Sequence, residues 1–128
     1  MKRAFAALLL AATAGLAAAP AEATLITYAA TLSGAAEAPP NASPGTGSTV
    51  VTIDTALQTM QVAITFSGLT GTTTASHIHC RTAIPGTGTA GVATITPNFT
   101  GFPLGVTAGV YSFTYSLNTA PAPITPPS

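Results

Sequence analysis

The sequence predicts an all-β domain, an antiparallel β-sandwich or barrel of the immunoglobulin-like kind. Three observations favour this class. Apolar and polar residues alternate with period two in several short segments, which is typical of half-buried strands. Glycine and proline turn signals separate these segments at intervals of about ten residues. After residue 23, no segment shows the apolar spacing of an amphipathic helix.

The N-terminal segment, residues 1–23, has the composition of a secretory signal peptide. Lys2 and Arg3 precede an apolar run at residues 4–16 that is too short and too rich in alanine to span a bilayer. Small residues follow, and Ala23 ends a match to the A-x-A cleavage pattern. We therefore expect cleavage after Ala23, a secreted or periplasmic protein, and no membrane span in the mature chain.

The first three strands are expected in the first half of the mature domain, which we place at residues 24–118. Residues 24–32 alternate, a loop rich in proline and glycine follows, and residues 48–54 are rich in β-branched side chains. Residues 59–66 show the clearest alternation of the chain, and their short connection to the preceding strand predicts a hairpin. The side chains expected to share the inward faces are Ile26, Tyr28, Ala30, Leu32, Met60, Val62, Ile64 and Phe66.

The second half contains shorter and less regular strand signals. Strands are expected at residues 76–80 and 92–96, and a longer one at residues 110–117. In the last of these, Tyr111, Phe113, Tyr115 and Leu117 fall on one face, and Phe99 and Phe102 in the loop before it are expected to close one end of the core. Residues 119–128 are rich in proline without a core pattern, so we expect a disordered tail.

Charge is scarce in the expected mature chain. Its charged residues are Glu37, Asp54 and Arg81. This composition argues against a nucleic-acid partner, which requires a basic patch to neutralise phosphates. It also argues against an enzyme, because general acid–base catalysis needs titratable groups. Hydroxyl-bearing and small side chains must therefore cover most of the surface.

The segment SHIHC, residues 76–80, holds both histidines and the one cysteine of the chain. On a strand, His77 and His79 project from the same face, with Ile78 opposite. Two such imidazoles can ligate Zn or Cu, and Cys80 can join them if the strand bends, although a metal site usually has further ligands. Alternatively, the histidines bind backbone or hydroxyl groups, and Cys80 is an inert free thiol or half of an intermolecular disulfide. The sequence leaves both interpretations open.

Two blocks of the sequence resemble the CHRD domain family in its secreted bacterial form. The first is YAATLSGAAEAPPNASPGTGSTVVTID, and the second is MQVAITFSGLTGTTTASHIHC. They occur in the order and at the spacing of the family, and with the Pro-Gly loop that follows they cover about residues 28–92. The residues that carry the resemblance are Leu32, Ser33, Gly34, Glu37, Pro39, Pro40, Gly68, Leu69, His77, Ile78 and His79.

The resemblance implies a secreted, non-enzymatic binding module or surface-associated structural module, with no cofactor expected. In chordin such domains belong to an extracellular binder of growth factors. For this chain the resemblance implies an unknown extracellular protein or surface ligand as the partner. Two alternatives remain: a small periplasmic metal-binding or redox protein that uses His77, His79 and Cys80, and a truncated, non-functional remnant of the domain.

The C-terminal part departs from the family. CHRD domains close with strands that carry a further histidine and a Gly-Gly-Glu run, and nothing after residue 117 matches them. The resemblance therefore implies an incomplete β domain. We expect such a domain to expose an edge strand, which together with Cys80 provides a route to self-association.

Overall fold

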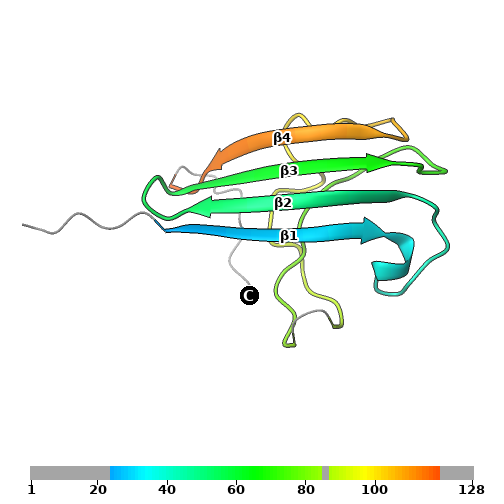
Figure 1. Ribbon diagram of the computed structural model, residues 1–128, viewed down its shortest axis with the longest axis horizontal. Coiled ribbons are helices and arrows are strands. Elements are labelled where there is room, and N and C mark those ends of the chain that lie inside the picture. Colours follow the sequence, from blue (N-terminus) through cyan, green and yellow to red (C-terminus); the bar gives the residue numbers. More distant parts are fainter. Residues whose placement is uncertain (1–23, 85–86, 119–128) are drawn as a thin grey trace, which may run out of the picture.

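The computed structural model describes residues 24–84 and 87–118. It contains four strands in one antiparallel sheet, in the order of the sequence (Figure 1). This confirms the predicted all-β antiparallel class. The expected signal peptide and proline-rich tail lie outside the described residues. The elements are β1 (Leu25–Ser33), the 3₁₀ helix η1 (Gly34–Ala36), β2 (Thr46–Asp54), β3 (Thr59–Ser67) and β4 (Gly109–Ser116).

The register of the sheet places the predicted apolar side chains on one face. Val62 of β3 pairs with Val51 of β2 and with Phe113 of β4. Tyr28 of β1 pairs in turn with Val51. Because directly paired residues project from the same side of a sheet, these strands share one apolar face. The opposite face is rich in threonine and serine, which agrees with the alternation read from the sequence.

The predicted hairpin is formed by β2 and β3, and an aspartate at the end of β2 stabilises its turn. Asp54 Oδ1 accepts hydrogen bonds from the backbone N–H groups of Ala56 at 2.9 Å and Leu57 at 2.8 Å. Gln58 completes the turn with a positive φ of 51°. Short aspartate side chains commonly bind the backbone in this way at turns. Asp54 therefore has a structural role in the hairpin.

Residues 68–84 and 87–108, called the covering segment below, lie between β3 and β4 in the sequence and run across the apolar face as a second, irregular layer (Figure 1). The strands expected at residues 76–80 and 92–96 are present there only as isolated bridges, Ser76 with Asn98 and His79 with Val92. A side-chain hydrogen bond also connects the two stretches, because Thr94 Oγ1 accepts the backbone N–H of Ile78 at 2.8 Å. Glycines and prolines around both stretches interrupt any longer ladder.

The core lies between β3, β4 and the covering segment. Val62 and Phe99 are its most buried large side chains, 0% and 1% exposed. Phe99, which was expected to close one end of the core, is a member of the core itself. The inward face of β1 is less covered than predicted, because Ile26 remains 37% exposed and Tyr28 60% exposed. The reason is the position of the covering segment, whose buried aromatic ring, Phe99, packs against Tyr111 and Tyr115 of β4 and not against β1.

A closed set of hydroxyl contacts ties β4 to the covering segment. The hydroxyls of Tyr111 and Tyr115 lie 2.7 Å apart. The Tyr111 hydroxyl donates to the carbonyl of Thr100 at 3.0 Å, and the N–H of Thr100 donates to the Tyr115 oxygen at 3.2 Å. With Tyr115 donating to Tyr111, every polar group of this set has a partner. Burial, followed by the hydrogen bond with Tyr115, raises the pKa of Tyr111 above its ordinary value.

The stability of the fold should fall at alkaline pH because of Tyr111. Its phenol ionises at a lower pH in the unfolded chain, about 10, than in the folded protein. Its contribution is therefore complete below about pH 10 and is lost as the pH rises toward the higher folded-state pKa. Urea unfolding at about pH 8 and about pH 11 should show this loss in the wild type and a smaller loss in Tyr111→Phe. An equal loss in both proteins would contradict the assignment.

Candidate functional site: a pocket and a histidine pair

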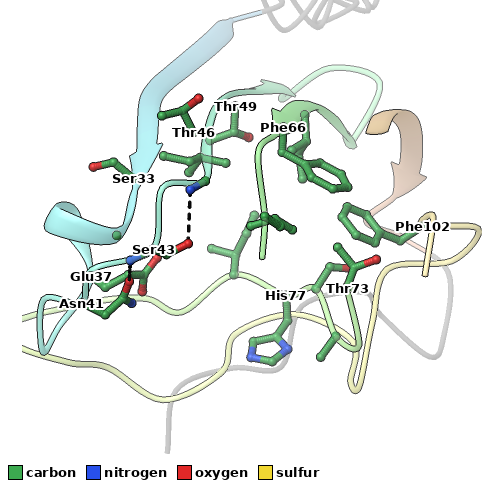
Figure 2. A pocket seen from close by; sticks show the side chains of 18 of the residues that line it. Ser33, Glu37, Asn41, Ser43, Thr46, Thr49, Phe66, Thr73, His77 and Phe102 are labelled. Carbon is green, nitrogen blue, oxygen red and sulfur yellow. Dashed lines mark hydrogen bonds between the residues drawn. The ribbon is translucent and has the colours of Figure 1, made fainter. Parts of the chain in front are cut away.

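A pocket of about 500 Å³ opens where the end of β1, the start of β2 and the covering segment meet. Its lining combines an apolar part, with Phe66 and Phe102 stacked at 5.7 Å between ring centres, and a polar part made mainly of hydroxyl groups. Figure 2 shows Phe66 and Phe102 on one side of the pocket and Glu37 and Asn41 on the other. Apolar walls with a few placed polar groups are typical of ligand pockets.

The first motif block builds one side of this pocket through a tight turn after β1. Gly34 is buried, and its carbonyl accepts the backbone N–H of Asn41 at 2.8 Å. Asn41 Oδ1 then accepts the N–H of Ser43 at 2.9 Å, and Ser43 Oγ accepts the N–H of Gly45 at 3.2 Å. These contacts fold the loop back onto Gly34. Leu32, Ser33 and Glu37 line the pocket as a consequence.

The second motif block forms the facing side. Gly68 has a φ of +73°, a conformation that glycine adopts without steric cost, and this turns the chain away from β3. Leu69 then lines the pocket, and its N–H donates to the carbonyl of Thr107 at 3.2 Å. Further along, His77 and Ile78 also line the pocket. The two motif blocks, distant in sequence, therefore meet at one cavity.

The electrostatic character of the pocket is nearly neutral. Glu37 is the one carboxylate among the described lining residues, and no arginine or lysine belongs to them. The remaining polar groups are hydroxyls, the Asn41 amide and backbone atoms, with His77 at the margin. Groups of this kind bind uncharged polar ligands or single cations by hydrogen bonding.

The two histidines lie side by side on the outer side of the covering segment. Their ring centres are 4.8 Å apart, and the planes are tilted by 51°. Ile78 between them packs against the core, so the alternation predicted from the sequence holds although the segment is not a regular strand. Figure 2 shows the His77 ring pointing away from Phe66 and Phe102. The histidine pair therefore adjoins the cavity: His77 belongs to its lining at the margin, and His79 lies outside it.

Each imidazole binds a backbone carbonyl through Nδ1. His77 Nδ1 lies 3.2 Å from the carbonyl oxygen of Pro97, and His79 Nδ1 lies 2.7 Å from that of Ala90. These contacts agree with the alternative in which the histidines bind backbone groups, since they connect the first half of the covering segment to the second. They leave Nε2 of both rings without a hydrogen bond in the part of the chain that the structure describes.

Cys80 does not complete a three-ligand site with the histidines. It is exposed and free, and its backbone N–H donates to the carbonyl of Gly91 at 3.2 Å. Among the described residues, no group of three histidine, cysteine, aspartate or glutamate side chains is placed to hold a metal ion. Beyond the side chains that the structure describes, a metal at His77 and His79 would take its other ligands from water or from a bound molecule.

The remaining predicted motif residues lie outside the cavity. Pro39 and Pro40 are exposed, and neither they, Gly68 nor His79 belong to the lining. Sequence reasoning missed Asn41, Ser43, Thr73 and Phe102 as pocket residues. A signal for Asn41 and Ser43 existed, because such residues commonly bind the backbone in loops after glycine.

The sheet and the cavity define a small antiparallel β module with a ligand-sized, nearly neutral pocket. The chain belongs to the CHRD domain family, whose model matches residues 28–119, and this confirms the resemblance seen in the sequence. CHRD domains are extracellular-type, non-enzymatic binding modules. No curated protein and no solved structure matches the chain. Among the described residues, no helix is sufficiently long and apolar to cross a membrane.

Proposed function

We propose that this protein is a secreted CHRD module that binds a segment of an extracellular partner in the pocket between β1, β2 and the covering segment. The observation that carries the proposal is the convergence of the two family blocks on this cavity. Leu32, Ser33 and Glu37 come from the first block, and Leu69 and Ile78 come from the second. Residues that are distant in sequence and belong to the two blocks of one family motif thus line a single cavity.

The chemistry of the lining specifies the kind of segment that fits. The stacked rings of Phe66 and Phe102 offer an apolar surface, and the lining also carries hydroxyl groups, among them that of Ser33. Glu37 adds a single negative charge in a chain that has few charges. We therefore expect an extended peptide with an apolar side chain and a neighbouring polar or basic one.

Filling the pocket should abolish peptide binding. The probe is a phage-displayed library of random peptides, selected on the purified protein and then measured as synthetic peptides. Ala75 is exposed and lines the pocket, so Ala75→Trp should lower the affinity of selected peptides at least about tenfold. Ala56 is another exposed alanine, located in the β2–β3 turn outside the pocket lining, so Ala56→Trp is the matched control. Failure to enrich any peptide, or equal binding by both variants, would refute the proposal.

The free edge of β1 is a further expected contact surface. β1 is the first strand of the sheet, and residues 25–31 are all exposed. Unpaired backbone groups on such an edge can pair with another chain. Self-association through this edge, or through Cys80, stays a prediction.

A further inference from the structure

We propose that His77 and His79 form a copper(II) site through their two Nε2 atoms, on the outer side of the covering segment. The inference does not rest on the pocket function. It starts from the partners of the other ring nitrogens. A carbonyl oxygen can only accept a hydrogen bond, so the contacts with Pro97 and Ala90 require a proton on Nδ1 of each ring.

The position of that proton decides which atoms can bind a metal. In a neutral imidazole, one nitrogen carries the proton and the other keeps a lone pair. With Nδ1 protonated in both rings, Nε2 of His77 and Nε2 of His79 are the two electron-pair donors. Metal-bound histidines almost always donate their second N–H to a carboxylate, a backbone carbonyl or water. Both rings therefore already have the orientation and tautomer of a metal ligand.

The separation of the rings fits one metal ion between them. An ion about 2.0–2.1 Å from each Nε2 lies roughly 3.2 Å from each ring centre. The centres are then about 4.5 Å apart for a right angle at the metal and about 5.2 Å apart for a tetrahedral angle. The observed 4.8 Å falls between these values. The separation of the rings is therefore compatible with one ion bound by both Nε2 atoms.

The ligand set favours copper(II) over zinc. Sites of nitrogen and oxygen ligands bind divalent copper most strongly among the first-row ions, and copper(II) accepts a tetragonal arrangement with open positions for water. Structural zinc sites are almost always closed by four protein ligands. The described residues supply two here, and no third histidine, cysteine or carboxylate joins them. Water or a bound molecule would occupy the remaining positions.

The first test measures the tautomers of the metal-free protein. Long-range ¹H–¹⁵N correlation spectra of the histidine rings should show the proton on Nδ1 in both His77 and His79. A proton on Nε2 of either ring would overturn the proposal, because that nitrogen would then have no lone pair for a metal. This measurement needs no substitution, so it is independent of any effect on folding.

The second test measures copper binding to the purified protein in a Cys80→Ser background, which removes thiol oxidation. One copper(II) ion per chain should bind, and pulsed paramagnetic resonance should detect the remote Nδ1 atoms of two imidazoles. Because loss of an outer partner alone costs about 10–100-fold in metal affinity, His77→Gln and His79→Gln should each weaken binding at least about tenfold. Zinc should bind more weakly than copper.

The controls distinguish a loss of copper affinity caused by a missing ligand from one caused by unfolding. Each glutamine variant is melted beside its parent, and its copper affinity is compared at a temperature where both are folded. If both variants retain affinity within about twofold, or if copper binding requires the Cys80 thiol, the proposal is wrong. Failure of the peptide experiment leaves this result unaffected, since the tautomer and copper measurements use no peptide and the His77 ring points away from Phe66 and Phe102 (Figure 2).

Discussion

Replacing Phe99 by alanine should lower the free energy of unfolding by about 3–5 kcal/mol, the usual cost of removing a fully buried aromatic ring. Phe99 is 1% exposed, and its ring lies 5.9 Å from that of Tyr111 and 5.8 Å from that of Tyr115. Its backbone N–H also donates to the carbonyl of Ser76 at 2.9 Å. The ring therefore holds the covering segment on the sheet, next to the segment that carries the histidines.

The measurement is urea unfolding, compared with Leu57→Ala. Leu57 is 70% exposed in the β2–β3 turn, so its truncation should change the free energy of unfolding by no more than about 0.5 kcal/mol. Small domains have a net stability of about 5–15 kcal/mol, so the Phe99 variant should lose a large part of it. If Phe99→Ala cost less than about 1 kcal/mol, the ring would not be enclosed between the two layers.

The strands could be predicted from the sequence because each carries its own period-two pattern. Met60, Val62 and Ile64 alternate with small or polar residues, and the pattern by itself fixes which side faces the core. The exposure of Tyr28 could not be predicted in this way. It depends on how far a separate segment extends over the sheet, which is a tertiary property and leaves no trace in the alternation of β1.

The candidate site was predictable in part for the same reason. The shared side of His77 and His79 follows from their spacing, and the structure brings the two rings together. The carbonyl partners of their Nδ1 atoms belong to residues 90 and 97, which no local pattern connects to the histidines. The pocket could not be predicted from the sequence either. It forms where two loops meet, and contacts between loops depend on the whole fold.

Replacing Gly34 by alanine should destabilise the turn after β1 and open the polar side of the pocket. A Cβ atom on Gly34 would lie 2.8 Å from the carbonyl oxygen of Asn41 and 2.9 Å from that of Ser43, with the Asn41 Oδ1 atom also in contact. Carbonyl groups of the backbone cannot move aside as flexible side chains do. Overpacking of this kind costs about 1–3 kcal/mol, so the free energy of unfolding should fall by that amount.

Gly71→Ala is the matched control, since a Cβ at Gly71 would meet nothing within 4 Å and its φ is not in the left-handed region. In hydrogen exchange, the Asn41 N–H, which donates to the Gly34 carbonyl, should lose protection in Gly34→Ala and keep it in the control. Loss of protection without unfolding of β1 would show that the glycine of the Leu-Ser-Gly motif serves the pocket wall. Equal stability and protection in the two variants would mean that the loop accommodates a side chain, and the close approach at Gly34 would not explain the motif.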